Sequence, residues 1–131
     1  MNGNRYLLDT NAIIQLLKGN YELRDVLEGA LYVSISVIAE LEFLSFPLMS
    51  ERDKSLYNML RSRVHVFDLD SDNALLRQYI LEARKLGLKL PDAIIAGTAR
   101  ANGLSVLTAD DHFKKLDKEW NVEFYDADGK F

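Results

Sequence analysis

Short apolar segments alternate with longer helical segments along the whole chain, and this alternation constrains the fold more than any other feature. Strands are expected at residues 6–8, 31–35, 64–69, 104–108 and 122–125. Helices are expected between them, at residues 11–18, 21–28, 37–46, 50–60, 71–86, 91–102 and 110–116. Strands that alternate with helices favour a largely parallel sheet covered by helices on both faces. The chain is therefore expected to fold as an α/β protein.

Length and composition favour one domain. The chain has 131 residues and 48% hydrophobic content, which suits a single domain over residues 1–131 with a substantial core. Little in residues 126–131 is available to anchor them, so we expect a flexible tail there. The sequence contains no cysteine, which excludes a disulfide framework and thiolate metal sites.

Charge and hydropathy limit the partners. No segment approaches the roughly 20 apolar residues of a membrane span, and no signal peptide follows residues 1–5, so we expect a cytoplasmic protein without a membrane partner. The net charge of -4 argues against a general electrostatic binder of nucleic acid. Any action on nucleic acid should therefore be local or assisted by a metal.

Three aspartates lie at positions where chemistry is expected. Asp9 follows the first apolar strand and Asp110 follows the fourth, at the strand ends that form ligand crevices in open α/β sheets. Asp92 opens a helix whose apolar face should lie against the sheet. Each has an alternative role, since Asp9 and Asp92 also suit a helix start and Asp110 a turn. Their recurrence at one expected edge favours a common site.

A fourth acid is expected from the helix that begins after Ser36. Glu40 borders the apolar stripe formed by Val37, Leu41 and Leu44, which is expected to face inward. Glu42, two residues further on, should point elsewhere. This places Glu40 in the crevice and predicts that exchange of Glu42 has little effect.

Four carboxylates within several ångströms of one another repel, and a bound cation relieves that repulsion. Magnesium or manganese suits oxygen ligands, whereas zinc is disfavoured because His65 and His112 make no zinc-binding pattern. No set of residues resembles a serine, cysteine or histidine nucleophile with its base. One or two such cations, held by carboxylates, would also bind the phosphate oxygens of a substrate and activate water.

Four segments in this order resemble the PIN-domain family and, within it, the VapC-like toxins. They are residues 7–11 (LLDTN), 36–41 (SVIAEL), 90–96 (LPDAIIA) and 107–113 (LTADDHF), and the resemblance spans nearly the whole chain. A departure follows Glu40-Leu41, where the family often has glycine and this chain has the bulky residues 42–47.

The resemblance implies a three-layer α/β/α sandwich with a five-stranded parallel sheet. It also implies an Mg²⁺- or Mn²⁺-dependent endoribonuclease, the toxin of a toxin-antitoxin pair, with an RNA substrate, a cognate antitoxin and a homodimeric state. By matching position, the metal-binding and catalytic acids are Asp9, Glu40, Asp92 and Asp110, with Asp111 left as the alternative to Asp110. Supporting roles are expected for Thr10, Asn11 and His112.

Two other classes of protein with acids at strand ends require residues that this chain lacks. A phosphoacceptor receiver needs a second acid beside Asp9 and a lysine in its last strand, and a haloacid-dehalogenase-like phosphatase needs an acid where Asn11 stands. A PIN-like module that binds RNA or protein without cleavage, and a PIN nuclease of RNA maturation, remain as alternatives.

Two surfaces are expected outside the acidic site. The apolar run 43–49, with Tyr57 and Met59, either forms a groove for an antitoxin segment or extends the core locally. Guidance of the RNA backbone is expected from basic residues that the sequence does not rank, namely Lys18, Lys89, Arg100, Lys114 and Lys115.

Overall fold

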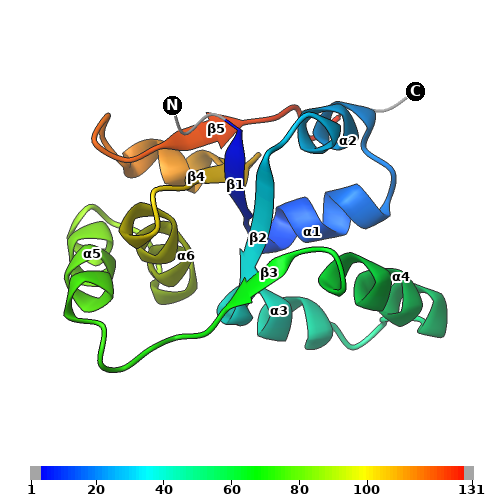
Figure 1. The fold of residues 1–131 in the computed structure, drawn as a ribbon, viewed down its shortest axis with the longest axis horizontal. Helices are drawn as coiled ribbons and strands as arrows, with labels where there is room; N and C mark the ends of the chain where they lie inside the picture. The colour runs from blue at the N-terminus through cyan, green and yellow to red at the C-terminus, as the bar shows by residue number, and fades with distance from the viewer. Residues whose placement is uncertain (1–3, 129–131) are drawn as a thin grey trace.

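The strands of this protein form one parallel sheet in the order β3-β2-β1-β4-β5, in a computed structural model that describes residues 4–128. The strands are β1 (Arg5–Leu8), β2 (Tyr32–Ser36), β3 (His65–Phe67), β4 (Ser105–Thr108) and β5 (Val122–Phe124). The helices are α1 (Thr10–Leu17), α2 (Tyr21–Glu28), α3 (Val37–Leu44), α4 (Glu51–Arg61), α5 (Ala74–Lys85), α6 (Leu90–Ala101) and the 3-10 helix η1 (Asp111–Lys115). In Figure 1, α5 and α6 lie on one side of the sheet and α1, α2 and α4 on the other. The predicted three-layer α/β/α sandwich with a five-stranded parallel sheet is confirmed.

The order of the strands locates the crevice of the sheet. The chain leaves β1 toward β2 and β3 and later returns to the other side of β1, where β4 and β5 are added. Strand order therefore reverses between β1 and β4, and in open α/β sheets the crevice beyond the carboxyl ends at such a point is where ligands bind. Asp9 and Asp110 lie just past these two strand ends.

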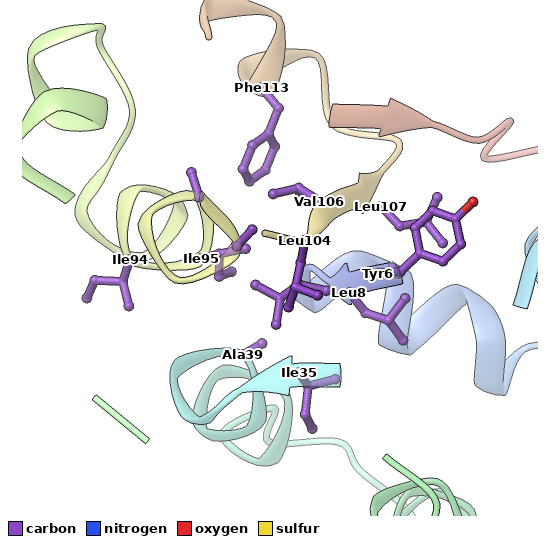
Figure 2. Close-up of a cluster of buried hydrophobic side chains, with 14 of the residues drawn as sticks. Tyr6, Leu8, Ile35, Ala39, Ile94, Ile95, Leu104, Val106, Leu107 and Phe113 are labelled. Carbon is purple, nitrogen blue, oxygen red and sulfur yellow. The ribbon is translucent and has the colours of Figure 1, made fainter. Parts of the chain in front are cut away.

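The core forms around the central strand β1 and its neighbour β4. Leu7, Leu8 and Leu107 are completely buried, because β1 and β4 are covered on both faces. Ile95 of α6 and Ile35 of β2 join the same cluster, which Figure 2 shows between the sheet and the helices. This rigid centre supports the strand ends from which the polar residues emerge.

Side-chain caps fix most helix starts close to the predicted positions. Ser36 caps α3, and Ser50 with Asp53 forms a capping box at the start of α4. One start differs from the helix predicted at residues 71–86, because α5 is capped by Asn73, whose side chain accepts a hydrogen bond from the amide of Leu76. Strand β3 is also shorter than predicted.

Part of the segment predicted as a flexible tail is hydrogen-bonded to the start of α2. Asn20 donates side-chain hydrogen bonds to the carbonyl oxygens of Asp126 (3.0 Å) and Ala127 (3.4 Å). The flexibility of residues 126–131 stays a prediction, and residues 129–131 lie outside the described residues. A membrane-spanning helix is absent from residues 4–128, whose longest helices have 12 residues.

Close packing of α5 against α6 depends on one glycine. A Cβ atom at Gly97 would lie 2.7 Å from Cγ1 of Ile80 and 3.0 Å from its backbone nitrogen. We therefore expect Gly97→Ala to force the helices apart and to lower the free energy of unfolding by about 1–3 kcal/mol, measured by urea unfolding. Gly29→Ala is the matched control, because a Cβ atom there would lie 3.9 Å from the carbonyl oxygen of Val26, an ordinary van der Waals contact. Equal midpoints for the two variants would contradict this view of the α5–α6 contact.

Candidate functional site

A pocket of about 490 Å³ opens at the carboxyl ends of β1 and β4, where strand order reverses. Its carboxylates come from four different parts of the chain, since one follows β1, one lies on α3, one opens α6 and one follows β4. The lining residues are Asp9, Thr10, Asn11, Leu41, Glu42, Ser45, Phe46, Asp92 and Asp110. Of the seven residues predicted to form or support the site, Asp9, Thr10, Asn11, Asp92 and Asp110 line this pocket.

Asp9 is the most deeply buried of these acids and is held at both oxygens. Its Oδ1 accepts a hydrogen bond from the amide of Ala12 (2.8 Å), which caps α1, and its Oδ2 accepts one from the hydroxyl of Thr108 on β4. Asp9 therefore both caps α1 and lines the pocket, two roles that the sequence suggests as alternatives. Thr108 was not predicted, and its hydroxyl joins the ends of β1 and β4 because it also accepts from the amide of Asp110 (2.9 Å).

The acid that α3 contributes to the pocket is Glu42. Its carboxylate accepts a 2.7 Å hydrogen bond from the hydroxyl of Thr10, which lies at the start of α1. The expectation that Glu42 points away from the crevice is wrong. The reason is the rotation of α3, whose buried residues are Ala39, Glu40 and Phe43, whereas Leu41 and Leu44 are exposed by 55% and 46%. The predicted inward stripe therefore lies on the wrong side of the helix.

Glu40 is not part of the pocket lining and is bonded to α4 instead. Its Oε2 accepts hydrogen bonds from the hydroxyl of Tyr57 (2.6 Å) and from Nε of Arg61 (2.5 Å). Burial alone raises the pKa of Glu40, but the bonds from Arg61 and Tyr57 and the charge of Arg61 outweigh it, so the pKa is lowered. Glu40 therefore does not lie in the crevice, where the sequence predicts it. Its carboxylate is instead bonded to Tyr57 and Arg61, which lie one helical turn apart on α4.

Asp92, Asp110 and His112 form one group at the other side of the pocket. Each offers a ligand atom that lies within 4.8 Å of the others. Asp110 accepts a 2.8 Å hydrogen bond from the amide of His112, and Nδ1 of the imidazole lies 2.8 Å from the same carboxylate oxygen. Asp111 is directed away, with a side chain that is 84% exposed and paired with Lys114 at 3.1 Å. Asp110, and not Asp111, therefore lines the pocket.

The acids of the pocket act on one another electrostatically. Burial raises the pKa of Asp9 to about 6, against the hydrogen bonds from Thr108 and Ala12, and the charges of Asp110 and Asp92 raise it further. The pKa of Asp92 is also raised, first by burial and then by the charges of Asp110 and Glu42. Because ionised carboxylates are unfavourable in this pocket, a bound cation that neutralises them should stabilise the folded chain.

A family model described as the PIN domain matches residues 6–119 of the sequence. The chain belongs to the PIN-domain family. No curated protein sequence matches it significantly. The family match covers all four acids of the pocket, together with Glu40.

Solved structures share the fold of this PIN domain. VapBC2 from Rickettsia felis, bound to a DNA fragment from its promoter, is 24% identical, with a TM-score of 0.78 over 92% of this chain and 98% of that one. DNA-bound VapBC from Salmonella typhimurium is 22% identical, with a TM-score of 0.74 over 92% and 97%. FitAcB from Neisseria gonorrhoeae is 22% identical, with a TM-score of 0.65 over 93% and 97%.

The donor set of this PIN domain fits a hard divalent cation. Carboxylate oxygens are the ligands that magnesium and manganese prefer, and Asp92 and Asp110 offer them within 4.8 Å of each other and of the His112 imidazole. Asp9 and Glu42 line the same pocket outside this closest group, and hydrogen bonds from Ala12 and Thr10 orient their carboxylates.

The basic residues proposed to guide RNA lie outside the pocket lining. Arg100 is held between the rings of Tyr79 (4.4 Å) and Trp120 (4.6 Å), where it packs the loop before β5 onto α5 and α6. Lys115 donates to the carbonyl oxygen of Gly87. The charge of Lys89, at the N-cap of α6, offsets a small part of the rise in the pKa of Asp92.

A second cavity, of about 310 Å³, adjoins the first and is mainly apolar. It lies between α1, the end of α3 and the segment leading into α4. Its lining residues are Ile14, Leu17, Lys18, Phe43, Phe46, Leu48, Met49 and Asp53, and we call it the apolar groove. Phe46 lines both cavities. Tyr57 is buried beneath Phe43 and Met59 lies outside the groove, so these two predicted groove residues do not line it.

Proposed function

We propose that this chain is a single-domain, metal-dependent endoribonuclease and the toxin of a toxin-antitoxin pair. One observation carries the proposal: four carboxylates from four separate elements line one pocket at the reversal point of a PIN-domain sheet. Such a group of acids is costly to a fold unless a cation uses it. The proposed cations are Mg²⁺ and Mn²⁺, and the proposed substrate is single-stranded RNA.

The residues of the pocket have distinct tasks in the proposed reaction. Asp9, Glu42, Asp92 and Asp110 would hold the cation. When bound, it activates water for attack on phosphorus and stabilises negative charge on the leaving oxygen. Thr108 and the amide of Ala12 fix Asp9, and Thr10 fixes Glu42. These bonds hold the carboxylates in place, so their geometry need not be reorganised during the reaction.

The deciding experiment is a cleavage assay with purified protein. We expect single-stranded RNA to be cut in Mg²⁺ or Mn²⁺ and to remain intact in chelator, with Asp9→Asn protein purified in parallel as the control for contaminating nucleases. Because the proposed nucleophile is water and not the 2′-hydroxyl of the RNA, the products should lack a 2′,3′-cyclic phosphate. Undiminished cleavage in chelator, or cyclic phosphate ends, would exclude this function.

The apolar groove supports the proposed antitoxin partner. Phe46 and Leu48 are exposed by 45% and 94%, which is unusual for large apolar side chains of one contiguous surface. The solved neighbours named above are VapBC and FitAcB structures, and another is a toxin-antitoxin complex from Klebsiella pneumoniae. We propose that an apolar segment of the antitoxin occupies this groove.

A charge in the groove should prevent this complex from forming. We expect Leu48→Asp to abolish co-purification with the proposed antitoxin, because an aspartate there would be buried without a partner. Met59→Asp is the matched control, since Met59 is 56% exposed and lies outside the groove. Hydrogen exchange of the complex should show protection at residues 43–49. Protection confined to other segments would refute the groove as the binding site.

Homodimerisation, which the resemblance to VapC-like toxins implies, stays a prediction. Leu75 and Leu81 of α5 are exposed by 46% and 62% and offer apolar surface for such a contact. Sedimentation of the purified chain tests it, and a monomer at all accessible concentrations would contradict it.

A further inference from the structure

The acidic pocket has one apolar wall, which the proposed chemistry does not use. Leu41 lies on α3 and Phe46 is the second residue past its end, and both line the pocket together with Glu42 and Ser45. Leu41 is 55% exposed and Phe46 is 45% exposed, although both are large and apolar. A site that only held a cation and a phosphate would have no need of this wall.

Phe46 is held in place despite its exposure. Its ring meets that of Phe43, which is 4% exposed, at 6.3 Å between centroids and 76° between planes. The amide of Phe46 donates to the carbonyl oxygen of Phe43 at 3.3 Å, and Pro47 restricts the backbone of the residue before it. An aromatic ring of restricted mobility is therefore presented at the mouth of the acidic pocket.

The charge of the pocket excludes the usual source of affinity for RNA. None of its described lining residues is lysine or arginine, and the chain carries a net charge of -4. Phosphate contacts by cationic side chains supply most of the affinity of ordinary nucleic-acid binders. Lys89 acts on Asp92 from outside the lining. Within the pocket, the attraction must therefore come from the cation and from contacts that carry no charge, and base stacking on an aromatic ring is a contact of this kind that single strands make.

We propose that Phe46 stacks against an unpaired base of the RNA next to the phosphate that is cleaved. The inference rests on the proposed function and adds a positioning contact to it, namely the ring of Phe46 against one unpaired base beside the cleavage site. The pocket volume of about 490 Å³ lies within the range of roughly 300–1,000 Å³ that holds small ligands, so a nucleotide fits beside the acids. Since Phe46 also lines the apolar groove, the base and a groove occupant would contact the same ring.

Binding and stacking are measured with a short single-stranded RNA that carries 2-aminopurine at successive positions. The protein is the full chain with Asp9→Asn, which slows cleavage, in Mn²⁺. At one position the fluorescence should be quenched on binding. Adding Phe46→Leu should remove the quenching and weaken binding by about 10-fold, because leucine keeps apolar contact and loses the ring. Phe46→Trp should retain both.

The control variant is Leu48→Ala, which alters the groove and not the pocket and should bind RNA as its parent does. Thermal unfolding of each variant verifies that it is folded. Binding should also depend weakly on salt, with a slope of log Kd against log salt below about 1, because few counterions are released.

Equal quenching and equal affinity for Phe46→Leu and its parent would overturn the inference, as would duplex RNA bound as tightly as single strands. The proposed function fails separately, when the unmodified chain cuts no RNA in any metal. Stacking that depends on Phe46 in a chain without cleavage would leave the inference standing as a property of an RNA-binding protein. Absence of both cleavage and quenching would overturn both proposals.

Discussion

Asp9→Asn and Glu42→Gln should each reduce metal-dependent RNA cleavage by at least about 100-fold, whereas Glu40→Gln should retain it. The first two changes remove a charged ligand while preserving shape, and both positions line the pocket. Glu40 lies in the contact between α3 and α4, bonded to Tyr57 and Arg61. The sequence alone predicts the reverse for the two glutamates, so this pair separates the two assignments.

The two glutamate variants should rank in the opposite order in stability, with Glu40→Gln the less stable of the two. Glu40→Gln replaces the carboxylate that accepts from Arg61, and the lost ion pair should lower the free energy of unfolding by about 1 kcal/mol, since Arg61 is half exposed and solvent weakens the pair. Glu42→Gln should leave metal-free stability unchanged or raise it. The measurements are kcat per folded protein at a temperature well below the unfolding midpoint, and the midpoint itself. Loss of cleavage in Glu40→Gln with retention in Glu42→Gln would restore the sequence-based assignment.

A divalent cation should raise the thermal midpoint of the folded chain, and Asp9→Asn should shrink that increase. Without metal, like charges at Asp9, Glu42, Asp92 and Asp110 are held together in the fold and separate on unfolding. A cation that binds only the folded chain at 100 times its dissociation constant stabilises it by about 2.7 kcal/mol. For a chain of this size the midpoint should rise by roughly 10 °C.

Asp9→Asn should be as stable as its parent in chelator, or more stable. Asparagine keeps the oxygen that caps α1 at the amide of Ala12 and removes the buried charge. Because the pKa of Asp9 is raised from 3.8 to about 6, the folded chain binds more protons than the unfolded chain between these values. The stability of the metal-free parent should therefore fall as pH rises from about 4 to about 6, by about 3 kcal/mol from this group. The variant should lack this loss.

Thermal unfolding of both proteins, in chelator and in excess Mn²⁺ at constant ionic strength, makes the comparison. Repeating the measurement at pH 4.5 and 7 tests the sign of the pH dependence. In chelator, the amount by which the midpoint of Asp9→Asn exceeds that of its parent should grow with pH. The rise in the midpoint of the parent on addition of Mn²⁺ should also grow with pH. A parent with one midpoint in both buffers, together with a clearly destabilised Asp9→Asn, would mean that these carboxylates are structural caps.

Two features of the chain made its fold predictable from local patterns. The alternation of apolar strands with helices requires a parallel sheet, and caps such as Ser36 and Ser50 mark helix starts by chemistry that acts over three residues. Where local signals competed, the prediction missed. Ser71 and Asn73 both suit a helix start, and only the packing of Leu76 and Ile80 against the core selects the second.

The sequence by itself determined which acids stand at strand ends, because parallel strands share one carboxyl edge and Asp9 and Asp110 are tied to it by the backbone. The acid supplied by α3 was decided only by the tertiary structure. That helix is apolar on nearly every side, so its pattern does not specify its rotation about its own axis. Burial of Ala39 and Phe43, with Tyr57 and Arg61 binding Glu40, turns the helix so that Glu42 reaches the pocket. Strand ends follow from chain connectivity, whereas the direction of a helix side chain depends on residues distant in the sequence.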